Sequence, residues 1–213
     1  MPEPPRGAWL DVGCSVGRTT FELAARTGDL ALGVDLSFAA LRTARRVATE
    51  GRARYPARKG GILYDRRDVA VDHPARARVD FWLCDATALA LPDAAFAGVT
   101  SLNVLDCVPS PLGHLLELGR VIAPGAPALI ATPFDWATSA TAVENWIGGH
   151  TQRAPHGGSS VAELRRLLSA GNDAGLGSGL AITAERTDVP WHVFVHDRAT
   201  MVYQAHVVAA HRQ

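Results

Sequence analysis

Residues 9–20 limit how this chain can fold more than any other stretch, because they join a strand pattern, a glycine turn and a helix start. The mostly apolar run WLDV at residues 9–12 is followed by a turn through Gly13 and Gly17 and by the helix-patterned TTFELAA at residues 19–25. Glycine has no Cβ, so it adopts positive φ angles and lets a ligand approach the backbone closely. Unpaired N–H groups at the start of the helix suit an anionic or carboxylate group. The stretch predicts a strand, a tight turn and a helix, with a ligand at the turn.

Strand and helix patterns alternate after this turn. Strands are expected at residues 30–34, 79–86, 98–103 and 128–132, and helices at 18–27, 37–47 and 112–118. Alternation with short turns is typical of a parallel sheet with helices on both faces. Right-handed crossovers then bring the carboxyl ends of the strands to one edge of the sheet.

The remaining segments interrupt or extend this pattern. Residues 50–79 lose periodicity and gain charge, Gly and Pro, so we expect an insertion near the mouth of the site, with the basic run from Arg42 to Arg67 as a solvated helix face and loop. Residues 133–160 are expected to be a substrate loop and lid, 161–169 a helix capped by Ser160 with Glu163, 171–179 a flexible connector, and 180–188 and 203–211 the last two strands. We expect one domain over residues 1–213.

Polar residues stand at the ends of four predicted strands, namely Asp11, Asp35, Asp85 and Asn103. A carboxylate in the position of Asp35 is placed to accept hydrogen bonds from ribose hydroxyls. This pattern indicates a nucleoside ligand without naming it. A nicotinamide site is disfavoured because the turn lacks the G-x-G-x-x-G register, and a phosphate loop is disfavoured because it lacks the lysine.

The motif D-x-G-C-x-x-G at residues 11–17 resembles the first motif of class I S-adenosylmethionine (SAM)-dependent methyltransferases, and the run RVIAPG at residues 120–125 also resembles that family. The resemblance implies a Rossmann-like α/β fold with a mostly parallel seven-stranded sheet, helices on both faces and an antiparallel edge strand. It implies SAM as cofactor and S-adenosylhomocysteine as its product, with Asp85 accepting the adenine amine and Asn103 beside the sulfonium. The expected cofactor-binding residues are Asp11, Gly13, Cys14, Gly17, Arg18, Asp35, Leu36, Ser37, Asp85, Ala86 and Asn103.

Residues 133–149 point to the acceptor. Their order, PFDW, a spacer and then ENWIGG, closely resembles the C-terminal methyltransferase domain of ovothiol synthases, the 4-mercaptohistidine N1-methyltransferase family, and the similarity extends over nearly the whole chain to residues 203–206. The resemblance implies N-methylation of an imidazole nitrogen of 5-thiohistidine or 5-selenohistidine. A methyltransferase for another small natural-product acceptor, acting on N or O, is the alternative. A non-catalytic protein with this fold is a third hypothesis.

Imidazole methylation requires an unprotonated nitrogen held about 3 to 3.5 Å from the methyl carbon and a group that holds the second ring proton. The candidate catalytic residues are Asn103, Asp106, Asp135 and Asn145, and the candidate substrate-binding residues are Phe134, Trp136, Glu144, Trp146 and Arg198. The two tryptophans could equally pin the loop to the core, and Arg198 could equally be a surface residue. Residues 191–198 are expected to form a second wall of the substrate site.

Charge and cysteine content exclude several classes of protein. Acidic and basic residues balance at 21 each, which gives no indication of nucleic-acid binding. The three cysteines lack C-x-x-C spacing, so buried free thiols are expected rather than disulfides or structural zinc, and no metal site is predicted. No apolar run is long enough to span a membrane and no signal peptide is recognised, so we expect a cytoplasmic protein.

The partners expected are a small histidine-derived substrate and either a second copy of the chain or a separate chalcogen-inserting iron enzyme, because the related domains are often fused behind such an enzyme. Only about eight residues precede the first predicted strand, whereas related domains carry helices there. An open site, a covering partner chain and an upstream start codon are the three explanations considered.

Overall fold

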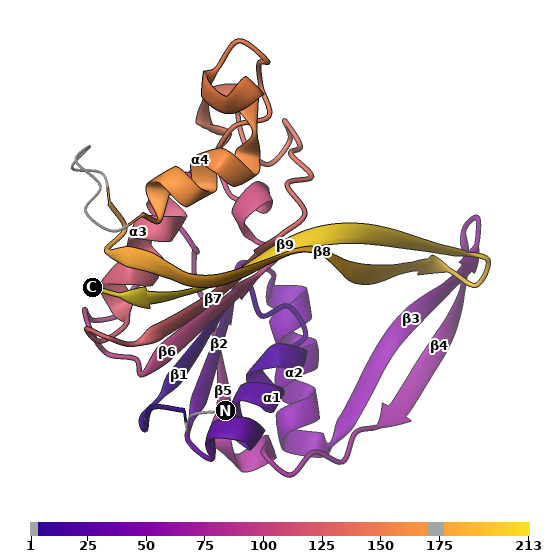
Figure 1. Ribbon diagram of the computed structural model, residues 1–213. Helices are drawn as coiled ribbons and strands as arrows, with labels where there is room; N and C mark the ends of the chain where they lie inside the picture. Colours follow the sequence, from indigo (N-terminus) through magenta and orange to yellow (C-terminus); the bar gives the residue numbers. More distant parts are fainter. Residues whose placement is uncertain (1–3, 170–176) are drawn as a thin grey trace.

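The fold is a seven-stranded sheet with helices on both faces and a separate two-stranded hairpin (Figure 1). A computed structural model describes residues 4–169 and 177–213, so most of the predicted connector at 171–179 lies outside the described residues. The elements are β1 (Trp9–Val12), α1 (Arg18–Thr27), β2 (Ala31–Asp35), α2 (Phe38–Glu50), β3 (Arg52–Gly60), β4 (Leu63–Ala70), η1 (Arg76–Arg78), β5 (Val79–Leu83), β6 (Gly98–Leu102), η2 (Leu105–Cys107), α3 (Pro111–Val121), β7 (Pro127–Thr132), η3 (Val143–Asn145), η4 (Pro155–Gly158), α4 (Ser160–Leu167), β8 (Leu180–His196) and β9 (Ala199–Arg212).

The strand order is β5-β2-β1-β6-β7-β9-β8. The first five strands in this order pair in parallel, and β9 is antiparallel to both β7 and β8. The predicted fold class is therefore confirmed. The antiparallel strand is β9, one position inside the edge strand β8. The parallel strands end along one edge, and the site residues lie there.

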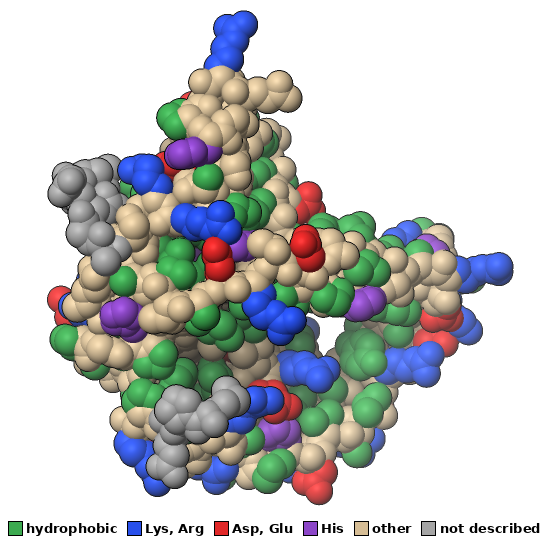
Figure 2. All heavy atoms as spheres, in the orientation of Figure 1, with side chains coloured by type: hydrophobic (Ala, Val, Ile, Leu, Met, Phe, Trp, Pro, Cys, Tyr) green, Lys and Arg blue, Asp and Glu red, His purple; other side chains and the backbone are tan. Residues whose placement is uncertain are grey.

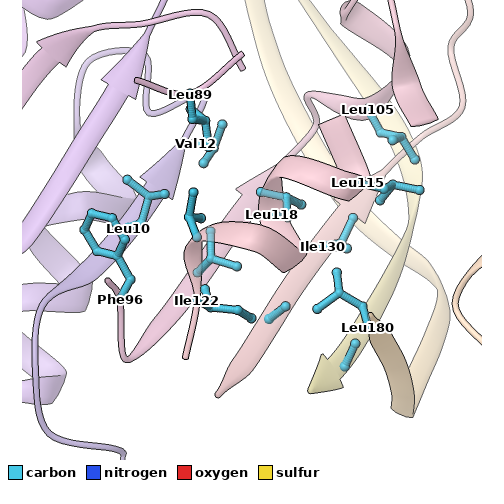
Figure 3. Close-up of a cluster of buried hydrophobic side chains, with 14 of the residues drawn as sticks. Leu10, Val12, Leu89, Phe96, Leu105, Leu115, Leu118, Ile122, Ile130 and Leu180 are labelled. Atoms are coloured by element: carbon cyan, nitrogen blue, oxygen red, sulfur yellow. The ribbon is translucent and has the colours of Figure 1, made fainter. Parts of the chain in front are cut away.

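Side-chain alternation along β1 divides the core between the two faces of the sheet. Leu10 and Val12 pack in the large cluster with α3 and α4, which is drawn in Figure 3. Trp9 belongs to the cluster beneath α1 on the opposite face. Each fully buried leucine of this core contributes about 1.5 to 3 kcal/mol relative to an exposed one.

The first turns of three helices are capped by serine. Ser37 caps α2 by accepting from Ala40 N, and Ser110 caps α3 by accepting from Gly113 N. The cap of α4 is Ser159, which accepts from Ala162 N, so the predicted cap at Ser160 is wrong by one residue. Ser160 is the first residue inside that helix, and its hydroxyl accepts instead from Trp136 Nε1.

Two hairpins replace the irregular segments expected from the sequence. The supposed insertion contains β3 and β4, whose register places Arg54 opposite Asp68, and Arg52 and Arg54 both bind the Asp68 carboxylate. The hairpin β8–β9 runs well past the predicted strand ends, through residues 191–198, which were expected to form a wall of the substrate site. Figure 1 shows β3–β4 rising from the end of α2 to the tip of β8–β9, and Figure 2 shows an opening between these arms and the body.

Within the described residues, no helix has the length and apolarity needed to cross a membrane.

Candidate functional site

The glycine turn joins β1 to α1 with several left-handed residues. Gly13 has φ 73° and Gly17 has φ 86°, and the N–H groups of Gly13 and Cys14 both donate to the Val34 carbonyl at 2.8 and 3.0 Å. A Cβ on Gly17 would lie 2.7 Å from the Phe81 ring, and one on Gly13 would collide with Val104. The missing side chains therefore serve close packing of the turn as well as its backbone conformation.

Asp11 lies beneath this turn rather than in the open crevice. Its side chain is buried, and its two oxygens accept from Thr20 Oγ1 at 2.7 Å and Thr100 Oγ1 at 2.8 Å. Burial raises its pKa to about 6, although the two threonine hydrogen bonds act in the opposite direction. Asp11 thus ties the start of α1 to β1 and β6, so any effect on a cofactor passes through the turn.

Asp35 holds the turn from the next strand. Its Oδ2 accepts from Ser15 N at 2.8 Å and its Oδ1 from Ser37 N at 2.7 Å. Each carboxylate oxygen retains a further lone pair, so the pair remains able to accept ribose hydroxyls. Leu36 beside it is 72% exposed, which leaves an apolar surface free for a nucleobase.

The predicted adenine-binding turn is anchored by a histidine that sequence reasoning missed. His114 on α3 is fully buried, which lowers its pKa, so the ring is neutral. Its Nδ1 lies 3.0 Å from the carbonyl oxygen of Ala86 and its Nε2 lies 2.8 Å from Ser101 Oγ. Nδ1 must therefore be the donor. Asp85 itself is exposed and accepts from the backbone and hydroxyl of Thr87, which lowers its pKa.

Asn103 ends β6 in the left-handed region, with φ 59°. Its Oδ1 is buried without a hydrogen-bond partner among residues 4–169 and 177–213. An unsatisfied buried acceptor at a strand end is costly unless a ligand supplies a donor. Asn103, Asp35 and the Asp85–Ala86 turn follow three strands of one sheet, as the sequence predicted, and they suit the ammonium, ribose and adenine groups of a nucleoside-linked amino acid.

A second group of polar residues lies just beyond Asn103. Asp106 in η2 is buried, and its Oδ2 accepts from the backbone N–H of Asp135 at 2.6 Å. Burial raises the pKa of Asp106, while the hydrogen bond from Asp135 lowers it. Phe134, between Asp135 and β7, adopts φ 54° and donates its N–H to Thr132 Oγ1. The turn after β7 is therefore held by the turn after β6.

Tyr203 on β9 completes this group. Interaction with the Asp135 carboxylate raises the pKa of the Tyr203 phenol, and the Trp191 ring stacks on the Tyr203 ring at 5.0 Å and 26°. Residues 191–198 were expected to form a substrate wall, but only Trp191 of that stretch has a described contact here. Tyr203 had no predicted role. We call Asp106, Asp135, Trp191 and Tyr203 the acidic-aromatic cluster.

Phe134 is positioned from its other side by a buried histidine. The His206 ring stacks on Phe134 at 6.1 Å, and its Nε2 lies 3.3 Å from Glu185 Oε2. Burial lowers the pKa of His206. Glu185 is held by Arg165 of α4 at 2.9 Å. The contact between His206 and Phe134 therefore holds the loop that carries Asp135.

Trp136 and Trp146 pin the substrate loop. Their rings stack at 5.8 Å and 14°, and their indole nitrogens donate to Ser160 Oγ and to the Thr141 carbonyl. Asn145 donates to the Pro109 carbonyl at 3.0 Å. These contacts favour the structural alternative for both tryptophans and engage the Asn145 amide with the backbone, whereas Glu144 is exposed at the loop surface.

Three further expectations concern Arg198, Arg18 and the cysteines. Arg198 lies in the turn between β8 and β9, five residues from Tyr203, or about 17 Å along an extended strand, so it is not part of the acidic-aromatic cluster. Arg18 is exposed and lines a cavity of about 570 Å³ between α1, α2 and β3.

Of the three free cysteines only Cys14 is buried, so burial was wrongly expected for Cys84 and Cys107. No metal-ligand cluster is found among the described residues.

Comparisons with known proteins agree with this architecture. A family model described as "Methyltransferase domain" matches residues 10–130, more than half of the chain. No curated protein matches. Among solved structures, a SAM-dependent methyltransferase from Methanosarcina mazei is 20% identical, with 100% of this chain and 94% of that chain covered and a TM-score of 0.61.

Two other solved structures share the fold. The structure reported for conversion of a disulfide bond into a thioacetal group during echinomycin biosynthesis is 21% identical and covers 99% of this chain and 77% of that one, with a TM-score of 0.62. The YcgJ protein of Bacillus subtilis is 16% identical and covers 98% and 93%, with a TM-score of 0.59. At these identities the likeness establishes the fold.

Proposed function

The chain belongs to the methyltransferase domain family and is a SAM-dependent methyltransferase, and from this premise we propose that it methylates an imidazole nitrogen of 5-thiohistidine or 5-selenohistidine. The product is of the ovothiol A or ovoselenol type. The proposal rests on the resemblance of residues 133–149 to the ovothiol synthase methyltransferase domain and on the acidic-aromatic cluster.

The cofactor supplies a methyl group on a sulfonium sulfur. We propose that Asp35 holds its ribose hydroxyls, that the turn Asp85–Ala86 holds the adenine, and that the unpartnered Oδ1 of Asn103 accepts from its ammonium group. Gly13 lets the amino-acid portion approach the backbone, and Cys14, Gly17 and Ser37 shape the turn around it. Asp11 acts from beneath, by holding Thr20 and Thr100.

The observation that carries the acceptor assignment is the acidic-aromatic cluster beyond Asn103, in which buried Asp106 accepts the backbone N–H of Asp135 and the Trp191 and Tyr203 rings stack. Carboxylates attract a cationic or N–H-bearing group, and the stacked Trp191 and Tyr203 rings offer a flat wall to a small ring. An amino-bearing imidazole satisfies both features. A small O- or N-nucleophile of another natural-product pathway is the alternative.

Incubation of the purified protein with SAM and each of three acceptors tests the proposal: 5-thiohistidine, 5-selenohistidine and histidine. We expect one methyl group to be added to the first or second acceptor, with an equal amount of S-adenosylhomocysteine. Mass spectrometry of the reaction mixture measures the methylated acceptor and the S-adenosylhomocysteine. If neither chalcogen-bearing acceptor is methylated while calorimetry shows that SAM binds, the acceptor assignment is wrong and the alternative acceptor class is favoured.

We further propose that the chain works in the cytoplasm on a free small molecule, either alone or as a homodimer. A separate iron enzyme would insert the chalcogen into histidine beforehand. This order follows from the chemistry, since the proposed acceptor already carries sulfur or selenium on its ring.

A further inference from the structure

Positive charge is concentrated in one segment of this chain, although the net charge of the whole chain is zero. Residues 42–78 contain 11 of the 21 Lys and Arg residues but only 4 of the 21 Asp and Glu residues, so the segment carries a net charge of +7 and the remaining residues carry −7. The segment covers most of α2 and all of β3 and β4. Figure 2 shows blue Lys and Arg side chains along the arm that β3 and β4 form. The balanced total therefore conceals a strongly basic region, which attracts anions.

Arginines from two elements line one cavity in this region. The cavity has a volume of about 710 Å³, and its walls include Arg42 of α2 and Arg54, Arg66 and Arg67 of the hairpin β3–β4. Arg66 pairs with Pro56, two residues from Arg54, so Arg54 and Arg66 share one face of the hairpin. We call this space the basic cavity. It brings together side chains that are up to 25 residues apart in the sequence.

Two of the four guanidinium groups are not engaged by the protein. Arg54 and Arg67 already have acidic neighbours on the hairpin, at 3.1 and 3.7 Å. Arg42 and Arg66 line the same cavity and make neither an ion pair nor a side-chain hydrogen bond within residues 4–169 and 177–213. A guanidinium group presents five N–H donors in a planar fork, which fits two oxygens of a phosphate group. Arg42 and Arg66 are therefore available to bind one anion from opposite walls.

The surroundings of the cavity indicate what kind of anion fits. Arg42 also lines a neighbouring cavity of about 370 Å³ together with Arg45 and Arg46, so the positive surface continues along α2 and suits more than one negative charge. Tyr55 lines the basic cavity with a side chain that is 46% exposed, which offers a flat surface to a ring. Sites for small molecules have volumes of about 300 to 1,000 Å³, and the basic cavity falls in this range.

We propose that the basic cavity binds a ring-bearing organic phosphate of the nucleoside diphosphate class, with Arg42 and Arg66 on its phosphate oxygens and Tyr55 against its ring. Arg54 adds positive charge at a fixed place, because Asp68 accepts from its Nε at 3.1 Å. None of the residues assigned above to the cofactor or to the acceptor lines this cavity. The site is therefore separate from the site of methyl transfer, and its test does not depend on which acceptor the protein methylates.

Calorimetry with pyrophosphate and with guanosine diphosphate (GDP) tests the proposal, at low ionic strength and with saturating S-adenosylhomocysteine, which fills the cofactor site. We expect both compounds to bind, and GDP to bind about 5-fold more tightly or better because its base stacks on Tyr55. Arg42→Ala and Arg66→Ala should each weaken the binding of both compounds about 10-fold or more. Both variants are expected to fold normally, since neither side chain has a partner in the described part of the chain.

Arg153→Ala is the matched control for these two variants. Arg153 is an exposed arginine that precedes η4, and its replacement removes the same charge outside the basic cavity, so both affinities should stay close to those of the wild type. Tyr55→Leu separates the two parts of the ligand. It should abolish the preference for GDP and leave the affinity for pyrophosphate unchanged.

Several results would overturn the proposal. One is that neither pyrophosphate nor GDP binds, and another is that Arg42→Ala and Arg66→Ala change their affinities no more than Arg153→Ala does. Binding of a single-stranded oligonucleotide in the absence of binding by both small compounds would identify the region as a nucleic-acid surface instead. Equal affinity of the wild type for GDP and pyrophosphate would contradict the placement of a ring on Tyr55.

Discussion

Replacing Asp11 by Asn has a stability effect that can be worked from its burial. The pKa of Asp11 is raised from 3.8 to about 6 in the folded chain. Each pKa unit corresponds to about 1.4 kcal/mol in the free energy of unfolding, so the titration of Asp11 changes that free energy by about 3 kcal/mol in total. Since the folded pKa is the higher one, this contribution is fully present below about pH 4 and is lost as the pH rises through about 6. Asn is neutral at every pH and similar in shape, so the Asn variant loses nothing over this range.

The free energy of unfolding in urea, measured for both proteins between about pH 4.5 and pH 7.5, gives the test. We expect the difference between variant and wild type to shift in favour of Asn by about 2 kcal/mol across that range, since part of the full change lies below pH 4.5. Asp197→Asn, in the exposed β8–β9 turn, controls for the loss of one carboxylate. A difference that stays constant with pH would refute the assignment of Asp11 as a buried, desolvated carboxylate.

Three other substitutions have defined outcomes. Gly17→Ala places a Cβ 2.7 Å from Phe81 at φ 86°, so it should lower the free energy of unfolding by about 1 to 3 kcal/mol; an unchanged urea midpoint would argue against close packing there. Asp35→Ala should weaken SAM binding about 10- to 100-fold by calorimetry, and unchanged affinity would place the ribose elsewhere. Arg198→Ala should leave KM and kcat unaltered, whereas a raised KM would indicate that the β8–β9 turn takes part in acceptor binding.

Strand-end residues were predictable because the direction of parallel strands is fixed by right-handed crossovers. Once strands were recognised at residues 30–34 and 98–103, Asp35 and Asn103 had to reach the same edge of the sheet. Their local roles were less accessible. Asp11 has the same sequence pattern whether it faces the crevice or the underside of α1, and only the partners Thr20 and Thr100 decide between these.

Contacts between distant segments escaped prediction. Tyr203 comes near Asp135 because β9 pairs antiparallel with β7 as far as Thr132 and His206, and His114 reaches the Ala86 carbonyl from α3, so neither contact leaves a local signal. The hairpin β3–β4 was missed for a different reason. Its strands are supported by cross-strand pairs such as Arg54 with Asp68 instead of an alternating apolar face, and periodicity therefore indicated a loop.

The central claim is that the methyl group of SAM ends on a ring nitrogen of a chalcogen-bearing histidine. NMR of the product formed from SAM isotopically labelled in its methyl group tests it most directly, with 5-thiohistidine and 5-selenohistidine as acceptors. We predict through-bond correlations from the labelled methyl group to the imidazole ring carbons adjacent to one nitrogen. A labelled methyl group on sulfur or selenium, or no label in either acceptor, would contradict the claim.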